Sequence, residues 1–261
     1  MAAVERESLA EQLGIAPLSA RSVALSALLG SHPPRLPVRA LVSMGSLFGV
    51  AEGAMRTALS RMVLAGEVAL VDAEYVLGDR LRRRQAWQDA GRRAGTEPWD
   101  GAWWSAVVSA ERRSTAQRRN FRALMAEHRM AELRPEVWLR PANIDGPTPS
   151  DGVLVIRGQL TGGSGIELAG RLWDLPSLAA DATELLTLSA EALSWLRRDD
   201  PSAMVDAFLV SIAVVRFLRA EPLLPPALAG PGWPPDELRR IYHELEQAYA
   251  VQMSSFLAAA S

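Results

Sequence analysis

Residues 54–66 hold the pattern from which the rest of the chain is interpreted. They read Ala54-Met55-Arg56-Thr57-Ala58-Leu59-Ser60-Arg61-Met62-Val63-Leu64-Ala65-Gly66. At the helical period the apolar side chains fall on one side: Met55, Leu59, Met62 and Val63. The polar side chains fall on another side as two i, i+4 pairs: Arg56 with Ser60, and Thr57 with Arg61. The segment therefore predicts an amphipathic helix with a buried back and an exposed front.

The front of this predicted helix carries two guanidinium groups and two hydroxyl groups. An arginine makes bidentate contacts with a guanine edge or a phosphate, and Ser and Thr hydroxyls bond to either. An ordinary amphipathic surface helix has the same pattern. The segments on either side are needed to choose between these two interpretations.

The flanking segments have the element order of a winged helix-turn-helix domain. Pro33-Pro34 stops the first helix, Phe48-Gly49-Val50 is a turn, and Gly66 ends the third helix as a C′ glycine. The elements are expected over residues 20–29 (helix), 38–47 (helix), 54–65 (helix), 68–71 (strand) and 75–77 (strand). In such domains the third helix enters the major groove, so the order favours DNA binding.

The composition is that of a globular protein, with 49% hydrophobic and 22% charged residues among 261. There are no cysteines, which excludes disulfides, thiolate metal sites and a cysteine nucleophile. The first 18 residues do not have the pattern of a signal peptide. No apolar run is long enough to cross a bilayer. We therefore expect a cytoplasmic protein without membrane contact.

The charge is distributed unevenly along the chain. Residues 1–135 hold 19 Arg against 14 acidic residues, whereas residues 136–261 hold 9 Arg against 16 acidic residues. A basic front half and an acidic rear half suggest that only the front half meets a polyanion. All basic residues are Arg, which suits contacts with phosphate.

A second unit is predicted to begin at Trp99-Asp100-Gly101. A buried strand is expected over residues 103–110, a helix with a basic start over 114–128, and further strands at 137–139 and 153–156. The succession of strand, helix, strand, loop and strand favours a small α+β domain of ferredoxin-like type.

The remaining segments are expected to be helices and connections. Residues 1–18 are expected to be a loose leader. The glycine-rich segment 158–170 is expected to be a flexible turn, because its spacing fits neither a Walker loop nor a nucleophile elbow. The further helices are predicted over residues 81–93, 174–195, 201–218 and 236–259.

Four stretches along the chain occur in an order that is specific to one protein family. They are residues 55–62 with Gly66; Trp99-Asp100-Gly101 with Trp103; Leu133 through Val137-Trp138-Leu139-Arg140-Pro141; and Leu172-Trp173-Asp174-Leu175 with Leu223-Leu224-Pro225 and Gly232-Trp233-Pro234. In these stretches, from about Arg21 onward, the chain resembles the PaaX family of bacterial transcriptional regulators, first associated with phenylacetic acid catabolism.

The resemblance implies a homodimeric repressor that an aromatic acyl-CoA, such as phenylacetyl-CoA, releases from an operator on double-stranded DNA. It also implies three parts: a winged helix-turn-helix domain, a middle domain shaped like the small CRISPR-associated nucleases, and a helical C-terminal domain. We place these parts at residues 19–95, 96–171 and 172–261, after the leader of residues 1–18. The predicted fold class is therefore α+β and mostly α.

Seven residues are predicted to contact DNA. We expect the front of the 54–65 helix to face the major groove, and arginines near the second and fourth helices to hold phosphates. The seven are Arg56, Thr57, Ser60, Arg61, Arg35, Arg39 and Arg82. The predicted wing carries Asp72 and Glu74 where relatives often have basic or aromatic residues, so we expect little phosphate contact from it.

An acyl-CoA effector needs arginines for its phosphates beside an apolar slot for its acyl tail. Residues that supply both occur in the predicted middle domain: Trp103, Arg113, Arg118, Arg119, Arg122 and Trp138. A solvated basic helix, with the tryptophans in a core, fits the same pattern.

The alternative class of function is a hydrolase of CoA thioesters or nucleotides that uses the middle domain. The three histidines of the chain are His32, His128 and His243, and they do not have the spacing of a zinc motif. The strand that ends at Ser109-Ala110-Glu111 lacks the Asp that a nuclease of this shape needs for its metal. We therefore predict no enzyme activity, catalytic residue, metal or cofactor.

Overall fold

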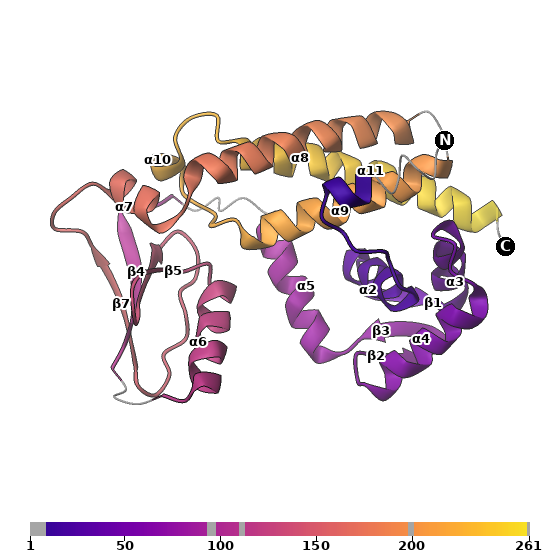
Figure 1. Cartoon of the computed structure of the whole chain (residues 1–261), viewed down its shortest axis with the longest axis horizontal. Helices are drawn as coiled ribbons and strands as arrows, with labels where there is room; N and C mark the ends of the chain where they lie inside the picture. Colours follow the sequence, from indigo (N-terminus) through magenta and orange to yellow (C-terminus); the bar gives the residue numbers. More distant parts are fainter. Residues whose placement is uncertain (1–8, 93–97, 110–112, 198–200, 260–261) are drawn as a thin grey trace. The chain divides into compact units, whose positions relative to one another are not determined.

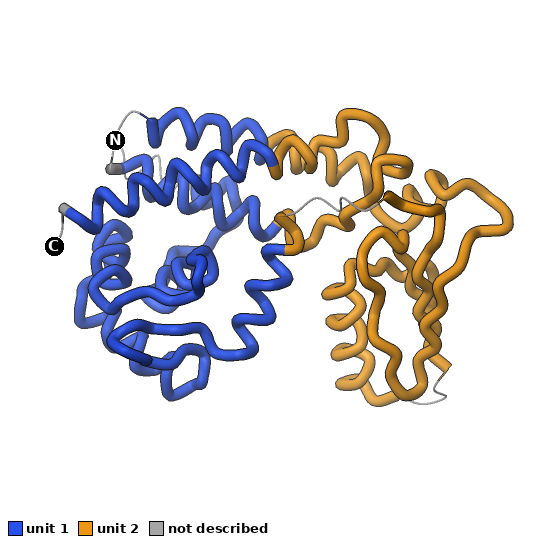
Figure 2. The backbone as a smooth tube through the Cα atoms, turned by 180° about the vertical axis from the view of Figure 1, so that it is seen from behind, with its two compact units in different colours: residues 1–89, 185–216, 240–261 blue, residues 90–184, 217–239 orange. Residues whose placement is uncertain are grey.

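The computed structural model describes residues 9–92, 98–109, 113–197 and 201–259. It is mostly helical and contains two small antiparallel sheets, which confirms the predicted α+β, mostly α class. The chain forms two compact units, shown in different colours in Figure 2. Unit 1 comprises residues 1–89, 185–216 and 240–261, and unit 2 comprises residues 90–184 and 217–239.

The first part of unit 1 consists of helices and a three-stranded sheet (Figure 1). The strands lie in the order β1-β3-β2, and both neighbouring pairs are antiparallel. The elements are α2 (Ala20–Gly30), β1 (Arg35–Pro37), α3 (Val38–Leu47), α4 (Glu52–Leu64), β2 (Val68–Val71) and β3 (Glu74–Leu77), followed by α5 (Asp79–Arg92).

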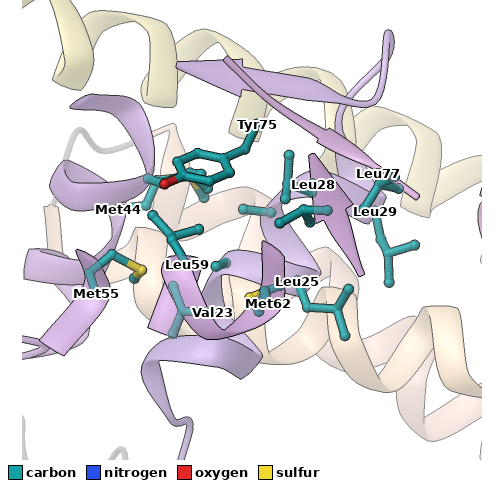
Figure 3. Close-up of a cluster of buried hydrophobic side chains, with 14 of the residues drawn as sticks. Val23, Leu25, Leu28, Leu29, Met44, Met55, Leu59, Met62, Tyr75 and Leu77 are labelled. Carbon is teal, nitrogen blue, oxygen red and sulfur yellow. The ribbon is translucent and has the colours of Figure 1, made fainter. Parts of the chain in front are cut away.

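The core of unit 1 lies between these helices and the sheet. Figure 3 shows side chains from α2, α3, α4 and β3 meeting there. Met55, Leu59 and Met62 of α4 are at most 1% exposed, so the predicted back of this helix is buried as expected. At about 25 cal/mol per Å² of buried apolar area, this burial supplies the main force that holds α4 in place.

Besides α5, three long helices contribute to both units: α8 (Leu175–Leu196), α9 (Pro201–Ala220) and α11 (Pro234–Ala259). Within unit 1, the ring of Phe208 lies 4.9 Å from that of Phe48 and 6.2 Å from that of Tyr249, measured between ring centroids. These contacts extend the core of unit 1 to α9 and α11.

Unit 2 contains a four-stranded antiparallel sheet in the order β5-β6-β4-β7. Its elements are β4 (Ala102–Val108), α6 (Thr115–Glu127), β5 (Ala131–Arg134), β6 (Val137–Pro141), β7 (Val153–Gln159), α7 (Gly165–Leu172) and α10 (Pro226–Ala229). Side chains of α6 pack on one face of the sheet, against Ala106 and Trp138. Side chains of α7 and α10 pack against Trp103 and Leu139, which occupy the other face.

Several local expectations were wrong. Val63 was placed on the buried face of α4 but is 38% exposed, because it lies at the margin of the apolar stripe. The glycine-rich segment 158–170 contains most of α7, which begins after Ser164 caps its first turn through the N–H of Glu167. The leader is not loose where it is described: residues 9–12 are helical and Leu13 is buried.

Candidate nucleic-acid interface

The exposed face of α4 is held in position by a tight turn after α3. The N–H of Val50 donates to the carbonyl oxygen of Gly45 at 2.9 Å, and Gly49 has a φ of +69°. A Cβ atom on Gly45 would lie 2.8 Å from the terminal methyl of Met55. The absence of a side chain at position 45 leaves room for the end of the Met55 side chain where α3 and α4 pack together.

The C-terminal end of α4 is also fixed by backbone bonds. The N–H of Glu67 donates to the carbonyl of Met62, and that of Gly66 donates to the carbonyl of Val63, both at 2.9 Å. Gly66 has a φ of +66°, as a C′ glycine requires. The sequence prediction that Gly66 ends this helix is confirmed.

The structure brings Arg56, Thr57, Ser60 and Arg61 together on the exposed face of α4. Thr57 Oγ1 donates to the carbonyl of Gly53 at 2.7 Å, and Ser60 Oγ donates to that of Arg56 at 3.0 Å. Because both hydroxyl hydrogens are used within the helix, the oxygen lone pairs remain as acceptors. They suit donors such as the amino groups of cytosine and adenine.

The two arginines of this face differ in their surroundings. Arg56 Nε donates to Glu52 Oε1, one turn earlier, at 2.7 Å. Among the described residues, Arg61 has no ion pair or side-chain hydrogen bond. Both pairing partners, Arg56 and Glu52, are more than half exposed, so this ion pair is weak and separates readily when a stronger ligand arrives. Arg61 has no such pair to break.

The three arginines predicted to hold phosphates lie in different settings. Arg39 is exposed in the first turn of α3, where the helix dipole disfavours a cation, and it has no acidic partner within the described residues. Arg35 belongs to β1 and lies 3.6 Å from Glu74 of β3. Arg82 forms an ion pair with Asp79 in the first turn of α5, and this pair lowers the pKa of Asp79. Arg39 is therefore the arginine of the three that is most available to an anion.

The β2–β3 hairpin, which corresponds to the predicted wing, carries no basic residue. Asp72 and Ala73 join its strands with φ values of +50° and +63°, as in a two-residue type I′ turn. Leu70 and Val71 are 54% and 47% exposed. The hairpin is therefore short, apolar and acidic, as expected, and it offers phosphates no cationic side chain.

Glu67, in the turn between α4 and β2, contacts both α2 and α5. It forms a two-bond ion pair with Arg21 of α2 and lies 3.7 Å from Arg80 of α5. The hydrogen bond from Arg21 holds the pKa of Glu67 below its ordinary value. Sequence reasoning missed this residue because its partners are distant in the chain. The charge of Arg80 is partly satisfied by Glu67, so Arg80 is a poorer phosphate ligand than Arg39.

The predicted effector residues do not form one group. Trp103 and Trp138 lie on opposite faces of the sheet in unit 2, and both are mostly buried. Arg113 pairs with Glu136 and stacks over the ring of Phe121, 4.7 Å from its centroid. Arg122 lies 3.8 Å from Glu132. Arg118 and Arg119 are exposed on α6, and within the described residues neither side chain forms an ion pair.

Unit 2 contains a buried charged cluster that sequence reasoning missed. Glu221, which is 0% exposed, pairs with Arg239 and accepts from the indole N–H of Trp233 at 3.5 Å. Arg129 donates to the carbonyls of Leu218 and Glu221 near the end of α9. Burial lowers the pKa of Arg129 to about 10, so it stays charged at neutral pH.

Arg140 extends this buried cluster toward the sheet. It donates to the carbonyls of Pro141 and His128 and to Asn143 Oδ1, at 2.8–3.0 Å. Asn143 in turn donates to the carbonyl of Leu223 at 2.8 Å. Burial lowers the pKa of Arg140 to about 9. Arg140 and Arg129 thus act as buried caps for the carboxyl ends of α6 and α9.

The described part of the chain has neither a candidate metal centre nor a candidate membrane span. No group of three or more His, Cys, Asp or Glu side chains there is arranged to hold a metal ion. None of the described helices combines the length and apolar character that a membrane span requires. Glu111, which ends the strand expected to lack a metal-binding Asp, lies outside the described residues.

Comparison with known proteins places these features in a family. The PaaX-like protein model matches residues 19–81, and the model of the PaaX-like protein C-terminal domain matches residues 173–259. The chain belongs to the PaaX-like family. PaaX-family proteins are transcriptional regulators that bind DNA. The first match spans α2, β1, α3, α4 and the β2–β3 hairpin, and it includes Arg35, Arg39 and the two arginines on the front of α4.

A solved structure is similar to this PaaX-like chain over nearly its whole length. It is the uncharacterized protein Rv0674 from Mycobacterium tuberculosis, with 35% sequence identity and a TM-score of 0.73. The similarity covers 91% of this chain and 98% of that chain. Among curated proteins, none matches this chain.

Proposed function

We propose that this PaaX-like chain is a sequence-specific DNA-binding repressor whose helix α4 reads the major groove. The observation that carries the proposal is the exposed set Arg56, Thr57, Ser60 and Arg61 on a helix whose back is buried. Base edges in the major groove are read by such arginine and hydroxyl groups. The family membership supports the same conclusion.

The two sheets of the chain belong, in this proposal, to two known types of domain. We interpret α2, α3, α4 and the sheet β1-β3-β2 as a winged helix-turn-helix domain, with α4 as the recognition helix. We interpret the sheet of unit 2 as ferredoxin-like. In support, β4 and β5 are joined by α6, and β6 lies between them in the sheet.

A homodimer fits the proposed way of reading DNA. Two copies related by a two-fold axis would present their α4 helices to half-sites about 34–36 Å apart, on a pseudo-palindromic operator. The additional phosphate contacts are assigned to Arg39, Arg35 and Arg82, in this order of availability, because Arg35 and Arg82 already have acidic partners.

The proposal is tested by the salt dependence of operator binding. Footprinting of genomic fragments with the purified protein identifies an operator, and affinity is then measured over a range of salt concentrations. We expect a steep loss of affinity with salt. In Arg39→Ala the slope of log affinity against log salt concentration should be smaller in magnitude by about 1, since one phosphate contact disappears. Arg171→Ala, which removes an exposed arginine of α7, is the matched control. Failure to protect any specific sequence would contradict the proposal.

For the effector we propose an aromatic acyl-CoA, as the family resemblance implies. Within the predicted set, Arg118 and Arg119 are exposed and form no side-chain ion pair with a described residue. We therefore assign the CoA phosphates to them. Phenylacetyl-CoA should raise the melting temperature of the protein, and the variant with both residues changed to Ala should lose most of this increase. If no CoA thioester stabilises the wild-type protein or affects DNA binding, this assignment is wrong.

A further inference from the structure

The first turn of α4 carries one large side chain, that of Glu52. Its neighbours Ala51, Gly53 and Ala54 are small, and all four residues are exposed. A Cβ atom added to Gly53 would meet no described atom within 4 Å, so this turn is open to a ligand. The N-terminal residues of a recognition helix are the ones that contact base edges. The proposed recognition helix therefore brings a carboxylate to the DNA together with its arginines.

The carboxylate of Glu52 uses one of its two oxygens to bind Arg56. Arg56 Nε donates to Glu52 Oε1 at 2.7 Å, and Arg56 Nη2 lies 2.7 Å from the same oxygen. Within the described residues, Glu52 Oε2 accepts no hydrogen bond, and the outer N–H groups of the guanidinium donate none. Arg56 can therefore donate to O6 and N7 of a guanine while it keeps its contact with Glu52.

A carboxylate in the major groove needs a hydrogen-bond donor. Phosphates and base acceptors repel it, and leaving its charge unpaired weakens binding to every sequence that offers no donor. Cytosine presents an N4 amino group, from which a glutamate accepts. Adenine presents its amino group beside the N7 acceptor, which repels a carboxylate. Cytosine is therefore the base that suits Oε2 of Glu52.

We infer that Glu52 is a specificity-determining residue, whose Oε2 accepts from N4 of a cytosine beside the guanine that Arg56 reads. The guanidinium covers the guanine edge of its own base pair. Because the two side chains are in direct contact, the cytosine belongs to the adjacent base pair, which stacks about 3.4 Å away. The inference rests on the proposed function, in which α4 reads the major groove, and it names part of the sequence that α4 reads.

A glutamate at this position also has an ordinary structural effect. A carboxylate in the first turn stabilises a helix through the helix dipole, and an i, i+4 pair with an arginine adds to this stability. Neither effect distinguishes one base from another. The base preference of the protein, and not its affinity or stability alone, therefore separates a specificity role of Glu52 from a structural one.

Selection from a pool of randomised double-stranded DNA by the purified full-length protein tests the inference. Wild type should select a cytosine in the base pair next to a guanine. Arg56→Ala should lose the preference for the guanine, and Glu52→Ala should lose the preference for the cytosine. Glu52→Gln should select adenine in place of the cytosine, because an amide binds N6 and N7 of adenine bidentately.

Titration of the selected sequence then measures the size of the effect. For wild type, changing the cytosine pair should weaken binding about 5-fold or more, whereas for Glu52→Ala the same change should have little effect. Asp72→Asn is the matched control, because it also removes one exposed negative charge from unit 1 and because asparagine tolerates the φ of +50° at this position. It should leave the base preference unchanged.

The outcomes separate this inference from the proposed function. A wild-type protein that selects no sequence would overturn both. A selected sequence whose binding requires Arg56 and Arg61, with the same base preferences in wild type, Glu52→Ala and Glu52→Gln, would overturn the role of Glu52 alone. A cytosine preference that Glu52→Ala removes, at a position further than one base pair from the guanine of Arg56, would overturn the paired reading of adjacent bases.

Discussion

Replacement of Arg61 by alanine is expected to weaken operator binding by about 1–3 kcal/mol, which corresponds to about 5- to 150-fold. Arg61 lies on the exposed face of α4, and no described residue competes for its guanidinium. Arg56→Ala should cost less, because binding of Arg56 to DNA must first break or share its ion pair with Glu52. The double variant should lose more affinity than either single variant.

The measurement is a titration of operator DNA at one fixed salt concentration, repeated with a fragment of unrelated sequence. If the two arginines read bases, affinity for the operator should fall much more than affinity for the unrelated fragment. Val63→Ala, an exposed apolar change on the same helix, should leave both affinities nearly unchanged. Wild-type affinity in the Arg56→Ala/Arg61→Ala protein would show that α4 is not the recognition helix.

Periodicity was sufficient to predict α2, α3 and α4 of unit 1. In α4, residues at i, i+4 and i+7 are buried, and the terminating Gly66 has the backbone conformation that favours glycine. The pattern placed Val63 wrongly because a residue at the margin of an apolar stripe is buried only if a neighbour covers it. The short strand β1 was missed, since three residues that pair with β3 carry no period of their own.

The sequence could predict those parts of the candidate site whose residues all lie on one helix. The front of α4 follows from spacing alone, as does the i, i+3 pair of Arg82 with Asp79. The ion pairs that engage Arg35 and Arg80 depend instead on which acidic residues the fold brings near them. The effector set failed to come together for a related reason. Side chains alternate between the two faces of a sheet, and sequence could not show which face each tryptophan would join.

Glu221 in unit 2 should be the most sensitive charged residue for stability. It is fully buried, and it neutralises Arg239 in a cluster that also contains the buried guanidiniums of Arg129 and Arg140. Glu221→Gln keeps the size of the side chain but leaves buried positive charge without compensation. Removal of one partner from a buried ion pair costs about 3–5 kcal/mol. A loss of this size in the free energy of unfolding is therefore expected.

Asp236 provides a matched control, because it pairs with the same Arg239 at 2.9 Å but is 57% exposed. Asp236→Asn should change stability by about 0–1 kcal/mol, as is usual for an exposed pair. Urea unfolding followed by tryptophan fluorescence gives the free energy of unfolding of each variant, and Trp233, whose indole contacts Glu221, contributes to the signal. In the double variant Glu221→Gln/Arg239→Gln, part of the loss should be recovered, because the uncompensated charge is removed. Equal effects of Glu221→Gln and Asp236→Asn would mean that burial does not strengthen the Glu221–Arg239 pair.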